Sequence, residues 1–293
     1  MKRAHAFLAL ALVALTFPVG LPFLGAEPIK VFLLGGQSNM VGQTKTKSLT
    51  GDFANFKKVK REVRIFSGAD KVLGTSLEYL QPSLNSRPNN FGPELSFGHA
   101  LSHFFPDTKI ALIKYAQGGS FLATSSKSAN AWLYPTVADP SVNNNAYSRF
   151  QKTVADGLRA LEAAGFEPEI VGMMWHQGES NARTSDTIGK AGLEADQARY
   201  EKHLSDFIAD IRSLYGSNLP FLIGEITIPD DRPGAAAVIA AQKAVADADS
   251  NAVFVPGDDL VTVDRWHFDT ESIIKLGARF ASAYARNFGS RME

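Results

Sequence analysis

Cysteine is absent from all 293 residues of the chain. Its absence excludes disulfide bonds, a thiol nucleophile and lipid attachment to an N-terminal cysteine. The chain also lacks a net charge, because 30 lysines and arginines balance 30 aspartates and glutamates. No run of like charge occurs. The chain therefore has none of the electrostatic features typical of proteins that bind nucleic acid or an anionic membrane surface.

The rest of the composition is that of a globular protein. Hydrophobic residues make up 45% of the chain and charged residues 20%. A chain of this length buries a sizeable core. Neither an internal repeat nor a linker divides it, so we expect a single domain over residues 27–293, preceded by a leader over residues 1–26.

The leader is recognised by its charge and hydrophobicity. Lys2 and Arg3 precede an uncharged apolar run over residues 6–26, and charge returns at Glu27. This layout is typical of a signal peptide and predicts a secreted or periplasmic protein, cleaved after Ala26, without stable membrane association. An uncleaved anchor is the alternative, because about 20 apolar residues can span a bilayer.

Downstream of the leader, strand-length apolar runs alternate with segments of helical period. This alternation predicts an α/β fold, a three-layer α/β/α sandwich with a mostly parallel central sheet. The expected strands cover 30–34, 109–115, 169–175, 220–228 and 252–255, with shorter ones within 62–82. The expected helices cover 93–105, 146–164, 193–215, 234–249 and 271–287. A long loop over 117–145 is expected to belong to a binding site.

Four unusual sequence clusters follow expected strands or precede the last helix. Loops after successive parallel strands lie along one edge of such a sheet, where sites of this architecture form. The clusters are GGQSNM at 35–40, AQGGS at 116–120, WHQGES at 175–180 and DRWH at 264–267. Together they offer the parts that acyl transfer from an ester requires: a nucleophile, a base, an acid and donors for an oxyanion.

Ser38 is the predicted nucleophile. It follows an apolar strand and two glycines, which permit a tight turn and close approach of a substrate to the backbone. A turn serine or a helix cap is the alternative interpretation. Backbone N–H groups of Ser38 and Gly119 and the side-chain amide of Gln177 are candidate oxyanion donors, with Gly118 as the alternative to Gly119.

His267 is the predicted base. Asp264 precedes it by three residues, so one turn can direct the carboxylate to one imidazole nitrogen and leave the other for the nucleophile. A structural salt link is the alternative. Glu179 has three open roles: it holds its loop, contacts substrate or serves as the acid in place of Asp264.

No metal or cofactor is expected. His99 and His103 are spaced like two zinc ligands on a helix, but Ala100 stands where a zinc protease has its glutamate. Cysteine is not available to supply thiolates.

The clusters, together with FGPE at 91–94, resemble in content and order those of the SGNH hydrolases. Within that superfamily they are similar to the acetylesterases grouped as carbohydrate esterase family six and to sialate O-acetylesterase-like proteins. The resemblance implies a flavodoxin-like fold and metal-independent hydrolysis of acetyl esters. It also implies that Ser38 is nucleophile and first oxyanion donor, that Gly119 and Gln177 are the other donors, and that Asp264 and His267 complete a triad.

The expected function is that of a serine esterase that removes O-acetyl groups from an acetylated oligo- or polysaccharide through an acetyl-enzyme, as an acetylxylan esterase or a sialate O-acetylesterase-like enzyme. An inactive carbohydrate-binding protein and an esterase of non-carbohydrate acyl esters are the alternatives. An α/β-hydrolase is disfavoured, because Met40 replaces the second glycine of a G-x-S-x-G turn. Three aromatic residues of the long loop either stack on sugars or pack the loop: Phe121, Trp132 and Tyr134.

Overall fold

The computed structural model describes residues 25–293 apart from 85, 123–129, 136–143, 186–189 and 228–232. The expected leader thus lies almost entirely outside the described residues. Strand β1 (Glu27–Gly36) begins directly after the expected cleavage position. Over the described part of the chain, no helix is both long enough and apolar enough to span a bilayer.

A seven-stranded sheet forms the centre of the fold, in the order β4-β3-β6-β1-β7-β8-β9. Every neighbouring pair is parallel except β3 with β4. The other strands of this sheet are β3 (Lys60–Ala69), β4 (Leu77–Leu80), β6 (Ile110–Ala116), β7 (Phe166–His176), β8 (Phe221–Gly224) and β9 (Ala252–Val255). A separate two-stranded sheet pairs β2 (Thr44–Lys45) with β5 (Asn90–Phe91).

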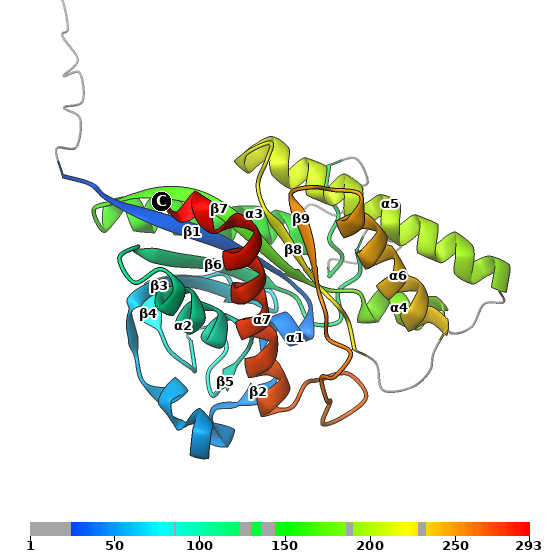
Figure 1. Cartoon of the computed structure of the whole chain (residues 1–293), viewed down its shortest axis with the longest axis horizontal. Helices are drawn as coiled ribbons and strands as arrows, with labels where there is room; N and C mark the ends of the chain where they lie inside the picture. The colour runs from blue at the N-terminus through cyan, green and yellow to red at the C-terminus, as the bar shows by residue number, and fades with distance from the viewer. Residues whose placement is uncertain (1–24, 85, 123–129, 136–143, 186–189, 228–232) are drawn as a thin grey trace, which may run out of the picture.

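Helices cover both faces of the large sheet (Figure 1). Helices α2 and α7 pack on one face, and α3, α5 and α6 pack on the other. The α-helices are α1 (Ser38–Val41), α2 (Glu94–Phe104), α3 (Ala146–Ala163), α4 (Glu179–Ser185), α5 (Lys190–Tyr215), α6 (Pro233–Asp247) and α7 (Thr270–Phe288). Short 3₁₀ helices cover Thr46–Ser48, Gly51–Lys57 and Gly289–Met292. The predicted three-layer α/β/α sandwich with a mostly parallel sheet is confirmed.

The central strand β1 is buried on both sides. Val31 and Leu33 belong to the core under α3, α5 and α6, whereas Phe32 and Leu34 belong to the core under α2 and α7. A strand covered on both faces needs apolar residues at every position, which is why this segment reads as a continuous apolar run.

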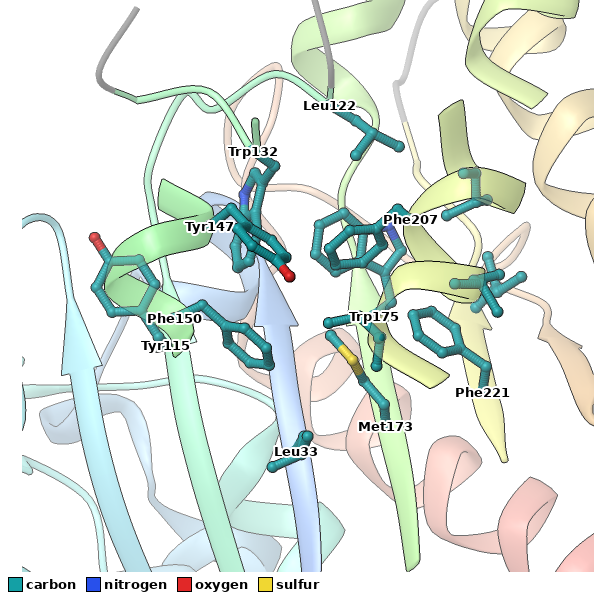
Figure 2. Packing of buried hydrophobic residues seen from close by; sticks show 14 of the residues in the cluster. Leu33, Tyr115, Leu122, Trp132, Tyr147, Phe150, Met173, Trp175, Phe207 and Phe221 are labelled. Atoms are coloured by element: carbon teal, nitrogen blue, oxygen red, sulfur yellow. The ribbon is translucent and has the colours of Figure 1, made fainter. Parts of the chain in front are cut away.

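Aromatic residues from the long loop complete the first of these cores (Figure 2). The ring centroids of Trp132 and Trp175 are 4.8 Å apart, and those of Trp175 and Phe207 are 4.6 Å apart. Trp132 and Tyr134 are fully buried, and Phe121 is half-buried. Trp132 and Tyr134 therefore pack the loop onto the sheet, which decides between the two roles that the sequence left open for them.

Three of the motif clusters meet because their strands end in register. Gly36 at the end of β1 pairs with Ala116 on one side and with His176 on the other. The residues that follow these three strands therefore lie along one edge of the sheet, as the sequence predicts for a parallel α/β fold.

Candidate active site

The turn that presents Ser38 depends on Gly36. This glycine has a φ of +153°, and a Cβ at its position would lie 2.1 Å from the backbone oxygen of His176. The N–H of the next residue, Gln37, donates to that same oxygen at 2.9 Å. The chain can thus turn tightly against β7 and start helix α1 with Ser38 as its first residue.

The far end of α1 is held by a buried ion pair. Lys114 Nζ donates to the carbonyl of Val41 at 3.1 Å and to Glu94 Oε2 at 2.7 Å. The other carboxylate oxygen of Glu94 accepts from the N–H of Gly92. Glu94 begins α2, so the FGPE motif starts a helix and positions this carboxylate.

Four of the predicted site residues line one cavity of about 320 Å³: Ser38, Gly119, Glu179 and His267. The remaining lining residues are Gln37, Gln43, Gly118, Ser180 and Trp266. A cavity of this size next to a serine and a histidine suits a small acyl group. The site is open to solvent on the side of the base, since the side chain of His267 is 27% exposed.

Asp264 and His267 form a close pair on the loop between β9 and α7. His267 Nδ1 lies 2.8 Å from Asp264 Oδ2, and Asp264 Oδ1 accepts the N–H groups of Trp266 and His267 at 2.6 and 2.8 Å. Burial alone would raise the pKa of Asp264, but these hydrogen bonds outweigh it and lower the pKa. The carboxylate is therefore ionised and holds the imidazole so that Nε2 is left free.

Ser38 and His267 share the cavity without being bonded to each other. Among the hydrogen bonds of the described residues, none joins the hydroxyl of Ser38 to the imidazole of His267. Such bonds are often long in a free enzyme and shorten when substrate fills the site.

The two glycines of the second cluster, Gly118 and Gly119, differ in the hydrogen bonding of their N–H groups. The N–H of Gly118 donates to Asp70 Oδ1 at 2.8 Å, and Asp70 also accepts from Arg87 at 2.9 Å. The N–H of Gly119 has no such partner among the described residues, and nothing lies within 4 Å of where its Cβ would be. Gly119 is thus the glycine whose N–H is available to a ligand.

Gln177 lies behind the cavity and is fully buried. Its Nε2 is within hydrogen-bond distance of Gln37 Oε1 (3.2 Å), Ser120 O (3.0 Å) and Asn181 Oδ1 (2.9 Å). Its Oε1 accepts from the hydroxyl of Tyr200. The amide ties together the ends of three strands, and its assignment as an oxyanion donor stays a prediction.

Glu179 is buried at the start of α4 and bonds to residues other than His267. Its Oε1 accepts from Asn39 Nδ2 at 2.8 Å and lies 3.8 Å from His176 Nδ1. Burial raises the pKa of Glu179 to about 7 and lowers that of His176 to about 4. Of the three roles left open by the sequence, the hydrogen bonding fits the one in which Glu179 holds its surroundings.

Asn39 is a contact residue that the sequence reasoning missed. It is buried and bonds to Glu179 and to the backbone on both sides of His267. The sequence does indicate this residue, because Asn39 follows Ser38 directly in the GQSNM motif. Within the described residues, no group of three or more His, Cys, Asp and Glu side chains is arranged to hold a metal.

The family profile described as carbohydrate esterase, sialic acid-specific acetylesterase matches residues 28–286. The chain belongs to this family. It is accordingly a carboxylic ester hydrolase of the carbohydrate acetylesterase class, as the motifs predicted. A comparison with curated proteins gives no match.

Solved structures with the fold of this acetylesterase support the architecture. A protein from Arabidopsis thaliana has a TM-score of 0.63 at 21% identity, over 89% of this chain and 99% of that one. A carbohydrate acetylesterase from Xanthomonas citri has a TM-score of 0.60 at 18% identity, over 89% and 56%. The protein NanS has a TM-score of 0.60 at 14% identity, over 91% and 99%. At these identities the likeness shows the fold.

Proposed function

We propose that this acetylesterase removes O-acetyl groups from an oligo- or polysaccharide through a Ser38-His267-Asp264 triad. The observation that carries the proposal is the pairing of His267 Nδ1 with Asp264 at 2.8 Å on a loop whose histidine shares a cavity with Ser38. Membership of a family of carbohydrate esterases supports the substrate class.

The reaction divides into two acyl transfers. In the first, Ser38 Oγ attacks the acetyl carbonyl carbon while His267 Nε2 takes the hydroxyl proton. The tetrahedral intermediate then expels the sugar oxygen, which receives that proton and leaves as an alcohol. In the second, His267 takes a proton from water and the resulting hydroxide attacks acetyl-Ser38. The proton then returns to Ser38 as acetic acid leaves, and acetic acid ionises in the solvent.

The oxyanion of each intermediate needs donors near the carbonyl oxygen. Ser38 and Gly119 both border the cavity, and the N–H of Gly118 is taken by Asp70. This supports the assignment of Gly119. Gln177, the third donor implied by the family, would have to release a buried acceptor to reach the oxyanion.

Replacement of Ser38 by alanine tests the proposal. We expect Ser38→Ala to lower kcat on an aryl acetate by at least about 1,000-fold, because the nucleophile is removed. Mass spectrometry of the wild-type enzyme, quenched during turnover, should find the acetyl group on the peptide that contains Ser38. Ser102→Ala is the matched control, since Ser102 is a buried serine that donates to His99 O on α2, outside the cavity.

Two results would contradict this function. One is a Ser38→Ala enzyme whose kcat stays within a few-fold of wild type. The other is Ser38-dependent turnover of the aryl acetate without release of acetate from any of a panel of acetylated xylans, sialic acids and other glycans, which would favour an esterase of non-carbohydrate esters.

A further inference from the structure

The side chain of Asn39 connects the nucleophile helix to the loop that carries the base. Asn39 is 1% exposed and follows Ser38 in α1. Its Nδ2 donates to the carbonyl of Trp266 at 2.9 Å, and its Oδ1 accepts the N–H of Phe268 at 3.2 Å. Trp266 and Phe268 are the two neighbours of His267 in the chain, so one side chain holds the backbone on both sides of the base.

The bonds of Asn39 fix the position of the His267 loop relative to α1, which Asp264 cannot do. Asp264 fixes the rotation of the imidazole, but it lies on the same loop as His267 and moves with it. The distance from His267 to Ser38 depends on where the whole loop sits relative to α1. Asn39 joins these two parts, and in the described chain no other side chain bonds to the backbone of both neighbours of His267.

The hydrogen-bond partners of Asn39 determine which way its amide points. The second proton of Asn39 Nδ2 goes to Glu179 Oε1 at 2.8 Å. The backbone carbonyl of Trp266 can only accept and the N–H of Phe268 can only donate, so the amide must place its nitrogen toward Trp266 and Glu179 and its oxygen toward Phe268. Both amide protons and the oxygen of Asn39 are thereby used.

We propose that Asn39 is a positioning residue that sets the distance between His267 and Ser38. It touches neither the substrate nor the reacting atoms. The proposal rests on the proposed triad and adds a device that aligns its two halves. Misplacement of a catalytic group by about 1 Å can cost about 100-fold in rate, so loss of this connection should lower kcat strongly.

The test exchanges donor and acceptor between the two side chains. Asn39→Asp keeps the shape and the acceptor for Phe268 but turns the donor toward Glu179 and Trp266 into an acceptor. We expect kcat on an aryl acetate to fall about 100-fold and KM to change less than about threefold, because His267 serves both acyl transfers and the substrate is not contacted. The double variant Asn39→Asp/Glu179→Gln supplies a glutamine donor for the new carboxylate but leaves the carbonyl of Trp266 without one, so the connection to the loop of the base stays broken.

The kcat of the double variant is expected to stay within about threefold of that of Asn39→Asp, because both lack the bond to Trp266. Asn39→Asp with kcat within about threefold of wild type, or a double variant at least about tenfold faster than Asn39→Asp, would overturn the proposal. Should Asn39→Asp alone not fold, Asn39→Ser removes the same bonds without a new charge and is held to the same kcat criterion.

Two controls separate positioning from stability and from the mechanism itself. Tyr284→Phe loses a buried hydrogen bond to the carbonyl of Val171 (3.1 Å), away from the sheet edge, and should lower Tm while leaving kcat unchanged. A wild-type protein without Ser38-dependent turnover would remove the proposed function. A wild-type enzyme that turns over, with an equally fast Asn39→Asp variant, would remove this inference alone.

Discussion

Asp264 and Glu179 are both acids within a few residues of a histidine, and their surroundings separate them. Asp264 is bonded to His267 and has a lowered pKa, whereas Glu179 is bonded to Asn39 and its pKa is raised to about 7. An acid that must stay ionised beside an imidazolium needs the first environment and not the second. We therefore assign the triad acid to Asp264 as a proposal that a pair of isosteric variants can test.

Asp264→Asn should lower kcat on a small acetate ester far more than Glu179→Gln. The asparagine cannot accept the Nδ1 proton of His267 in the same way, and the corresponding change in a serine protease lowers kcat by about 10,000-fold. Because the loop of this esterase is open to solvent, we expect kcat to fall by at least about 100-fold. Glu179→Gln keeps an acceptor for Asn39, so the loss of kcat in that variant should stay within about tenfold. Equal Tm values for the two variants make the comparison valid, and a more damaged Glu179→Gln would transfer the acid role to Glu179.

At the scale of the element, the turn between β1 and α1 leaves no room for a side chain at Gly36. Gly36 has both a positive φ and a backbone oxygen where its Cβ would be. Alanine there must push β1 away from β7, and the displacement falls two residues before Ser38. Geometry of the site and packing of the sheet edge are thus coupled through one residue.

Gly36→Ala should accordingly lower kcat by about 100-fold or more, along with Tm. Gly165→Ala is the matched control, because Gly165 also has a positive φ, +89°, but nothing lies within 4 Å of its Cβ position. Gly165→Ala should therefore lose about 1–2 kcal/mol of stability to left-handed backbone strain and keep the kcat of wild type. The comparison requires kcat per folded enzyme for both variants. A fully active Gly36→Ala would show that the turn tolerates displacement.

Apolar strands of the large sheet and the long helices were predictable from the sequence, and the short helices were not. The predicted strand 252–255 has the bounds of β9, and the predicted helix 146–164 exceeds α3 by one residue. The four residues of α1 and the seven of α4 carry too little periodicity to be read. Within the described part of the range 220–228, the strand is only Phe221–Gly224, because β8 pairs with β9 over four residues and with β7 over three.

The candidate site was predictable to the extent that parallel strands bring their carboxyl ends together. That rule placed Ser38, Gly119 and Glu179 at one edge, and the D-x-x-H spacing placed Asp264 against His267. Hydrogen-bond partners across the edge could not be read from the sequence. The bonds of Asn39 and two of the bonds of the Gln177 amide are made to residues more than 50 positions away in the chain.

For the molecule as a whole, the buried Glu179 makes stability depend on pH. A glutamate in the unfolded chain titrates near pH 4.3, whereas the pKa of Glu179 in the folded protein is raised to about 7 by burial. Between these values the folded state binds a proton that the unfolded state has lost, so the contribution of Glu179 to stability falls as the pH rises from about 4.3 through about 7. His176, with its pKa lowered to about 4 by burial, acts in the opposite sense up to its unfolded value of about 6.5.

Glu179→Gln removes the first of these contributions. We expect Tm of the variant minus Tm of wild type to increase from about pH 5 to about pH 8, by several degrees, since 1 kcal/mol shifts Tm by about 2–4 °C in a protein of this size. Thermal unfolding of both proteins across that range, followed by circular dichroism, measures the difference. A difference that stays constant over the range would mean that Glu179 titrates like an exposed glutamate.

The central place of β1 in the sheet also governs how the chain folds. β1 is the first strand of the domain to be synthesised, yet its two partners are β6 and β7, so Lys30 pairs with Ile110 on one side and Glu169 on the other. Pairing over such separations is slow, and an unpaired apolar strand promotes aggregation. Protection of this one strand during synthesis, rather than the stability of the finished sheet, should therefore set the yield of native protein.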